Sequence, residues 1–194
     1  MIIGLDLSLT STGVAVVHAD GRLYSATAIK SKLADAPRLI DIRNNLYSIL
    51  NKLSRKPTLA VLEGYAFGSQ ARHEAAGELG GIIKVTLFLD GIPVAVVPPS
   101  TLKKFVTGKG NAQKDEMRLA VFKKWGQEFR TNDEVDAFAL AQVGVILERH
   151  KQGIDVKPEL LKYEWEALQK VIEGEGRIES WKEMDEIAGK TLSS

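Results

Sequence analysis

Four carboxylates occupy positions in the sequence where they could bind a metal ion together. Asp6 interrupts the first apolar segment of the chain, and Glu63 ends a later one. Asp133 and Asp136 are three residues apart, so on a helix they project from the same face. Carboxylate oxygens, with no histidine or cysteine among them, are the ligands that Mg²⁺ and Mn²⁺ prefer. The pattern therefore indicates a divalent-cation site suited to phosphodiester hydrolysis.

Each of these acids also has an ordinary structural explanation when it is taken alone. Asp133 and Asp136 would complement the dipole of a helix in its first turn, and Glu63 could end a strand and pair with a lysine. Asp6 is harder to explain in this way, because a charge within an apolar strand is costly unless it is paired or bound to metal. The occurrence of all four in one sequential pattern favours a joint chemical role.

The composition excludes several other kinds of chemistry. The chain has 194 residues, 44% hydrophobic and 26% charged, which is typical of one globular domain with at most a small appendage. The absence of cysteine excludes disulfides, a thiolate nucleophile and cysteine-ligated metals. His18, His73 and His150 are scattered and are interpreted as incidental. No apolar run approaches the roughly 20 residues that span a bilayer, and no leader-like segment is recognised, so a cytoplasmic location is expected.

The net charge of +1 conceals an uneven distribution. Residues 101–130 contain eight Lys or Arg against three acids, whereas residues 131–150 contain one against four. A basic stretch beside a small acidic cluster suits a nuclease, because lysines bind phosphates and carboxylates bind metal. Solvated helix faces would give a similar distribution, so charge alone leaves both interpretations open.

Periodicity predicts the elements that position these residues. Apolar or alternating segments rich in β-branched residues predict strands at residues 2–7, 12–19, 22–30, 58–63 and 93–97. Helical spacing predicts helices at residues 39–53, 70–89, 113–125 and 132–149. Ser100 is the expected N-cap of a further short helix, and Asn132 that of the last one. The order predicts an α/β fold with a mixed sheet that begins as an antiparallel meander.

The character of the chain changes beyond Gly153. Residues 158–173 and 177–189 have the pattern of two acidic amphipathic helices. We therefore expect a nuclease domain at residues 1–150 and a helical C-terminal extension at residues 151–194. Packing, dimer stabilisation and a mobile tail are alternatives for this extension that the sequence does not separate.

Several motifs together resemble those of the RuvC family of Holliday junction resolvases, with phage-type members as plausible relatives. They include the strand and hairpin around Asp6, the strand that ends at Glu63, a basic segment, and an Asp-x-x-Asp-Ala helix. The matching segments keep the family's order and are residues 3–8, 12–15, 61–63, 79–81, 98–114 and 133–141.

The resemblance implies an RNase H-like fold with a five-stranded mixed sheet flanked by helices. It implies a homodimer that cuts four-way or branched DNA, with two Mg²⁺ ions per active site and Mn²⁺ as a substitute. Asp6, Glu63, Asp133 and Asp136 are carried over as catalytic metal ligands. The implied DNA contacts are Lys103, Lys104, Lys109, Lys114, Tyr65 and Phe67. The two aromatic residues flank Ala66, at the position where the family has a junction-wedging aromatic.

Other interpretations remain open at this point. A non-cleaving protein could keep the fold and bind branched DNA, and another RNase H-like nuclease could act on other DNA or on RNA hybrids. An actin-like sugar kinase has a phosphate-binding hairpin similar to residues 6–13, but 194 residues are too few for both of its lobes. The small residues of the expected helix at 70–89 fit either a dimer contact or packing on the protein's own sheet. They are Ala71, Ala75, Ala76, Gly80 and Gly81.

Overall fold

Five strands form one mixed sheet at the centre of the molecule. The computed structural model describes residues 1–64 and 70–172. The strands are β1 (Ile2–Asp6), β2 (Thr12–Val17), β3 (Leu23–Ile29), β4 (Leu59–Glu63) and β5 (Val94–Val97). Their order is β3-β2-β1-β4-β5; β2 is antiparallel to β1 and β3, and β4 is parallel to β1 and β5. The predicted mixed five-stranded sheet and its opening meander are confirmed.

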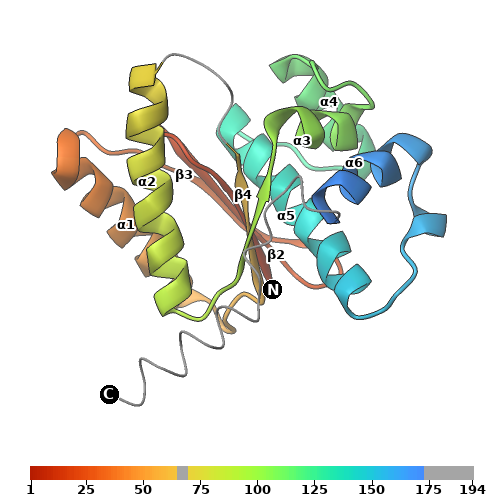
Figure 1. Ribbon diagram of the computed structural model, residues 1–194, viewed down its shortest axis with the longest axis horizontal. Coiled ribbons are helices and arrows are strands. Elements are labelled where there is room, and N and C mark those ends of the chain that lie inside the picture. The colour runs from red at the N-terminus through yellow and green to blue at the C-terminus, as the bar shows by residue number, and fades with distance from the viewer. Residues whose placement is uncertain (65–69, 173–194) are drawn as a thin grey trace.

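Helices cover both faces of this sheet (Figure 1). One face carries α1 (Asp35–Lys52) and α2 (Gln70–Leu89). The other carries α5 (Asn132–Lys151), and next to it lie α3 (Pro99–Thr107) and α4 (Lys114–Trp125). Among the described residues, no helix is long and apolar enough to cross a membrane.

The alternation of side chains along the strands determines which face the acidic residues occupy. Ile3 and Leu5 are buried in the core beneath α1 and α2, whereas Ile2 is buried in the core beneath α5. Because successive side chains of a strand point to opposite faces, Asp6 lies on the α5 side of β1. The same alternation along β4 places Glu63 on the α5 side as well, since Val61 belongs to that core.

Two glycines allow α5 to lie directly against the sheet. A Cβ atom on Gly4 would collide with the carbonyl oxygen of Ala137, and one on Gly13 would collide with the carbonyl oxygen of Asp133. Glycine in a strand permits this close approach of another backbone. The first turns of α5 are therefore held against the ends of β1 and β2.

A capping box determines where α5 begins. Thr131 Oγ1 accepts a hydrogen bond from the Glu134 N–H at 3.2 Å, and the Glu134 carboxylate accepts one from the Thr131 N–H at 2.9 Å. The expected N-cap at Asn132 is thus wrong by one residue, because the reciprocal pair satisfies two N–H groups that Asn132 alone would not.

The expected cap of α3 is also wrong. This helix begins at Pro99 with Pro98 as its N-cap residue, so Ser100 is already inside the helix. Proline suits the first helical position because its φ angle is preset and it has no N–H to satisfy.

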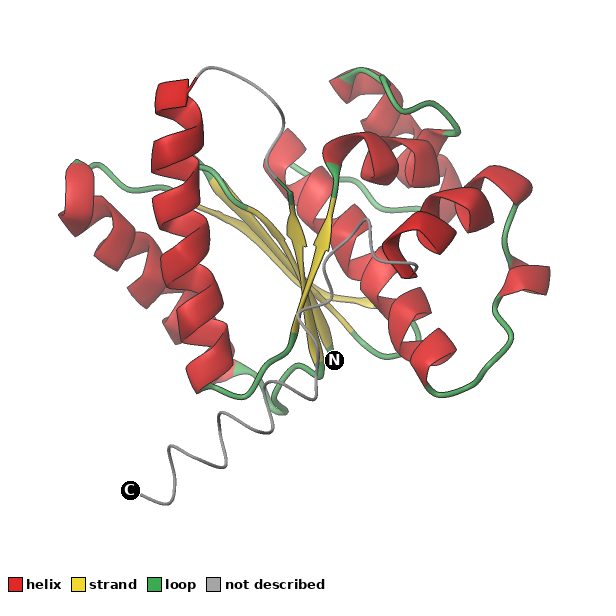
Figure 2. Ribbon diagram, in the orientation of Figure 1, coloured by secondary structure: helices red, strands yellow, loops and turns green. Residues whose placement is uncertain are grey.

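The described part of the C-terminal extension contains a 3-10 turn, η1 (Lys157–Glu159), and the helix α6 (Lys162–Ile172) (Figure 2). The expected helix at 158–173 is interrupted because the Glu164 carboxylate accepts the Leu161 N–H at 2.9 Å and so starts a new helix. The expected helix at 177–189 lies outside the described residues.

The helix α6 packs against α3 and α5. Its residues Ala167, Leu168 and Val171 are buried in the same apolar core as α5. The described part of the extension is therefore docked on α3 and α5 through apolar contacts.

Candidate active site

The ends of β1 and β4 bring the first two carboxylates together. Asp6 and Glu63 are the last residues of adjacent parallel strands and lie on the same face of the sheet. The carboxyl ends of parallel strands are the usual place for ligands in α/β sheets. The Asp6 and Glu63 carboxyl groups lie close enough that the negative charge of Glu63 helps to raise the pKa of Asp6.

The first turns of α5 add the other two carboxylates. The backbone of Asp133 lies against Gly13, the residue that pairs with Asp6 across the β1–β2 hairpin. The charges of Asp133 and Asp136 both raise the pKa of Asp6, and Asp136 also raises that of Glu63. The structure thus brings all four predicted acids into one electrostatic cluster.

Burial is the largest cause of the shifted pKa values in this cluster. It raises the pKa of Asp6 to about 8, with further contributions from the negative charges of the other three acids. Burial raises the pKa of Glu63 to about 7 and that of Asp136 to about 6. A site with this property favours any bound species that brings positive charge, whether protons or metal cations.

The donor set of the cluster fits a hard divalent cation. Four carboxylates provide only oxygen ligands, and their mutual repulsion falls when a cation binds. Within residues 1–64 and 70–172, no three Asp, Glu or His side chains converge tightly enough to form a preassembled metal site. The four acids therefore interact electrostatically without forming a preassembled metal site.

A pocket of about 250 Å³ opens beside the cluster. Its walls include Glu63, Asp136, Lys103, Lys114 and Asn132. The positive charge of Lys103 lowers the pKa of Glu63 and Asp136, and Lys114 also lowers that of Asp136. The pocket thus combines two carboxylates of the acidic cluster with two lysines, a set of side chains that could hold a cation and a phosphate side by side.

A larger pocket, of about 560 Å³, lies between α4 and the extension and contains none of the four acids.

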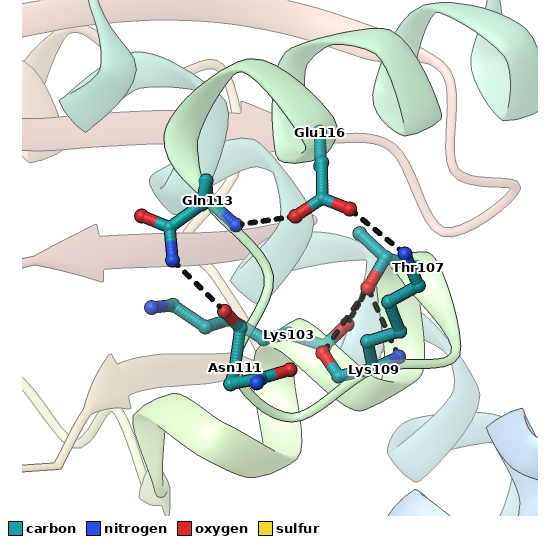
Figure 3. Close-up of polar contacts among 6 residues, drawn as sticks. All are labelled: Lys103, Thr107, Lys109, Asn111, Gln113 and Glu116. Atoms are coloured by element: carbon teal, nitrogen blue, oxygen red, sulfur yellow. Dashed lines mark hydrogen bonds and ion pairs between the residues drawn. The ribbon is translucent and has the colours of Figure 1, made fainter.

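The other two predicted lysines are occupied by ion pairs. Lys104 follows Lys103 on α3, but its Nζ atom lies 2.7 Å from a carboxylate oxygen of Glu166 in α6. Lys109 Nζ lies 3.0 Å from Glu116 of α4 (Figure 3). Because successive helical residues point about 100° apart, Lys103 faces the pocket while Lys104 faces the extension.

Hydrogen bonds hold the basic loop between α3 and α4 (Figure 3). Thr107 Oγ1 donates to the carbonyl oxygen of Lys103 at 2.8 Å and accepts the Lys109 N–H at 3.1 Å. The Gln113 N–H donates to Glu116 at 2.8 Å, which closes the loop onto the start of α4. The loop thereby fixes α3 relative to α4, and with it the positions of Lys103 and Lys114.

Tyr65 and Phe67 lie outside the described residues, so their roles remain predictions.

The pocket contains a residue that the sequence did not identify as functional. Asn132 was assigned a capping role, although its position next to Asp133 was a signal that it could reach the cluster.

Family and sequence comparisons place this arrangement among known proteins. The family model described as "Crossover junction endodeoxyribonuclease RuvC" matches residues 2–144. A protein of that name from Synechococcus sp. (strain WH7803) is 30% identical over 150 residues, covering 74% of this chain and 96% of the relative. The Prochlorococcus marinus (strain MIT 9313) protein of the same name is 27% identical with the same coverage. Residues 145–194 lie beyond the family match.

Solved structures show the same fold. The Thermus thermophilus RuvC structure superposes with a TM-score of 0.64 at 23% identity, covering 78% of this chain and 96% of that one. A fowlpox virus resolvase in complex with Holliday junction DNA superposes with a TM-score of 0.52 at 15% identity, covering 76% and 99%. The expected fold class is confirmed by these matches.

Proposed function

Because this chain belongs to the RuvC family of crossover junction endodeoxyribonucleases, we propose that it cuts four-way DNA junctions by metal-dependent hydrolysis. The observation that carries the proposal is the convergence of Asp6 and Glu63, from adjacent strand ends, with Asp133 and Asp136 of α5. A T. thermophilus RuvC with the same fold has been solved in complex with a Holliday junction substrate. The relatives' names and this complex support four-way DNA as the substrate here.

Asp6, Glu63, Asp133 and Asp136 would together hold two Mg²⁺ ions, with Mn²⁺ as a substitute. Bound in such a site, the ions supply a water of lowered pKa and neutralise charge on the phosphate and on the departing 3′-oxygen. The carboxylates would orient these ions, and because burial raises the pKa of Asp6 and Glu63, any proton that they hold would be released when a cation binds. The negative charge on the ionised carboxylates would then be balanced by the bound ions.

Lys103 and Lys114 would bind the phosphate backbone at the pocket, where both side chains line the wall. Lys104 and Lys109 can bind DNA phosphates only if they break their ion pairs with Glu166 and Glu116. Both pairs are at least partly open to solvent, where an ion pair contributes little stability, so a phosphate can replace the glutamate. Tyr65 and Phe67 would stack on bases at the branch point, as aromatic residues do in other nucleic-acid sites.

A homodimer would place two such sites on one junction. The outer face of α2 supports this assembly, because Val85 and Leu89 are 57% and 71% exposed. Gly81 lies one turn before Val85, and a Cβ atom there would meet nothing within 4 Å. Gly80 is instead buried. Gly80 thus packs on the chain's own sheet, whereas Gly81 would allow close approach of a second copy of the chain.

We further propose that residues 1–150 carry the nuclease activity and that residues 151–194 are an extension added to it. The family match ends before the extension begins, and all four acids precede it. Its described part supports α3 through buried contacts of α6.

A substrate panel tests the proposed function. Labelled four-way junction, duplex, flap, fork and RNA–DNA hybrid are incubated with the protein and Mg²⁺, with EDTA as the control. Paired symmetric nicks near the branch point of the junction, abolished by EDTA, are the expected result. Tight junction binding without cutting would instead indicate an architectural protein, and preferential cutting of the hybrid would indicate a different RNase H-like nuclease.

A further inference from the structure

Asn132 is the one amide side chain in the wall of the catalytic pocket. It lines the pocket together with Glu63, Asp136, Lys103 and Lys114. The cap of α5 is formed by Thr131 and Glu134, so the Asn132 side chain is not needed to cap the helix. The Asn132 amide in the pocket therefore belongs neither to the acidic cluster nor to the helix cap.

Arg118 of α4 fixes the orientation of this amide. Its Nη1 atom donates to Asn132 Oδ1 at 3.3 Å, and its Nη2 atom donates to the carbonyl oxygen of Phe129 at 2.6 Å. A guanidinium group has donors and no acceptor, so the oxygen of the Asn132 amide must face Arg118. The NH₂ group is then the end of the amide that Arg118 does not hold.

The NH₂ group of Asn132 is left available to a ligand. Among the described residues, no acceptor is assigned to Asn132 Nδ2. A neutral N–H donor next to carboxylates can bind a phosphate oxygen without competing with metal ions for those carboxylates, whereas an added lysine would compete. The chemistry of this position thus matches that of a DNA phosphate.

We propose that Asn132 donates its amide N–H to a phosphate oxygen of the DNA strand in the pocket, and that Arg118 is the positioning residue that orients the amide. This inference rests on the proposed function, because it takes DNA as the occupant of the pocket. It assigns a substrate contact to a residue outside the metal cluster and outside the basic segment's lysines.

Asparagine-to-aspartate substitution separates substrate contact from structural support. Asn132→Asp keeps an oxygen for Arg118 and makes that hydrogen bond charge-assisted, but it replaces the donor with a negative oxygen. Asn132→Ala removes both. We expect Asn132→Ala to weaken junction binding by roughly tenfold or more. Asn132→Asp should weaken binding further while it keeps the thermal stability of the wild type. Asn51, an exposed residue of α1, provides the matched Asn→Asp control, which should bind within about twofold of the wild type.

Arg118→Met tests the positioning role in a double-mutant cycle. If Arg118 acts through Asn132, the double variant Arg118→Met/Asn132→Ala binds no more weakly than Asn132→Ala. Additive losses would show that Arg118 contacts DNA by itself, which would overturn the positioning role.

The measurement is fluorescence anisotropy of a labelled four-way junction in EDTA, with single-turnover cleavage in Mg²⁺ recorded in parallel. Wild-type binding by Asn132→Asp would overturn the inference and leave a purely structural role, even while the wild type cuts the junction. A wild type that neither binds nor cuts the junction would overturn the proposed function and this inference together.

Discussion

Asp6 shows at the scale of one residue how a catalytic site reduces the stability of its own fold. Burial and three neighbouring acids raise its pKa to about 8, so at neutral pH the folded chain holds a proton that the unfolded chain would release. Ionised Asp6 is then unfavourable in the folded protein until a cation balances it. The cluster is therefore expected to lower the folding stability of the metal-free protein and to increase its affinity for divalent cations.

The pH dependence of stability tests this view of Asp6. Its folded-state pKa lies above its ordinary value of 3.8, so the folded state binds more protons between the two values and stability falls as pH rises from about 4 to about 8. In EDTA, Asp6→Asn should be more stable than the wild type at about pH 8, and the difference should shrink toward about pH 4. Urea unfolding at both pH values measures it.

Added Mg²⁺ provides the control for this prediction. It should raise the stability of the wild type at the higher pH more than that of Asp6→Asn, because the variant has lost a ligand. A stability difference that stays constant with pH would show that folding does not raise the pKa of Asp6.

At the scale of elements, the position of α5 decides whether the site forms. The carbonyl of Asp133 lies where a Cβ on Gly13 would be, so Gly13→Ala must push the first turn of α5 away from β1. Overpacking of this kind costs typically about 1–3 kcal/mol, and junction cleavage should fall with the displacement of Asp133 and Asp136. Chemical unfolding and single-turnover cleavage measure the two effects.

Gly77→Ala is the matched control for Gly13→Ala. A Cβ at Gly77 would meet nothing within 4 Å, and alanine favours a helix over glycine by about 1 kcal/mol. This variant should therefore be as stable as the wild type or more stable. Equal stability of Gly13→Ala and Gly77→Ala would refute the close contact between α5 and β2.

The docking of α6 depends on one buried carboxylate. Glu164 is 3% exposed and lies 2.7 Å from Lys124 Nζ, which in turn lies 4.2 Å from the centre of the Phe105 ring. Glu164→Gln should destabilise the protein by about 1–3 kcal/mol, because Lys124 loses its charge partner in a largely apolar setting. Glu166→Gln removes a partly exposed pair with Lys104 and should change stability by less than about 1 kcal/mol. Thermal unfolding of both variants compares the two glutamates, and equal losses would contradict a special role for Glu164.

The elements also show how far the sequence could be interpreted. The buried strands were predictable because β1 and β4 are continuous apolar runs. The acidic cluster was predictable because Asp6 interrupts one such run, Glu63 ends another, and Asp133 and Asp136 have the spacing of one helix face. The first residues of α3 and α5 were not predictable, because a helix cap depends on which of several adjacent residues finds a hydrogen-bond partner. The ion pairs of Lys104 and Lys109 and the Asn132–Arg118 contact join residues on different elements, and periodicity carries no information about such contacts.

At the scale of the whole molecule, the outer face of α2 is the surface on which the proposed dimer would depend. Val85 is exposed there, beside Gly81 and Leu89. Val85→Glu should convert a dimer into a monomer and leave the fold intact, since a charge in an apolar interface is costly but is harmless in water. Light scattering coupled to size exclusion measures the mass.

Leu119→Glu is the control for assembly, because Leu119 of α4 is exposed to a similar degree at 53% but lies on the opposite side of the sheet. This variant should keep the dimer. Loss of the dimer in Leu119→Glu but not in Val85→Glu would move the interface from α2 to α4.

The most direct test of the central claim is single-turnover cleavage of a four-way junction as Mg²⁺ is titrated, for the wild type and four amide variants. Asp6→Asn, Glu63→Gln, Asp133→Asn and Asp136→Asn should each lower the rate by roughly 100-fold or more. Asp115→Asn, which removes an exposed acid from the first turn of α4, should cut at the wild-type rate. Near wild-type cleavage by any of the four variants would contradict the account that these carboxylates act as one metal site.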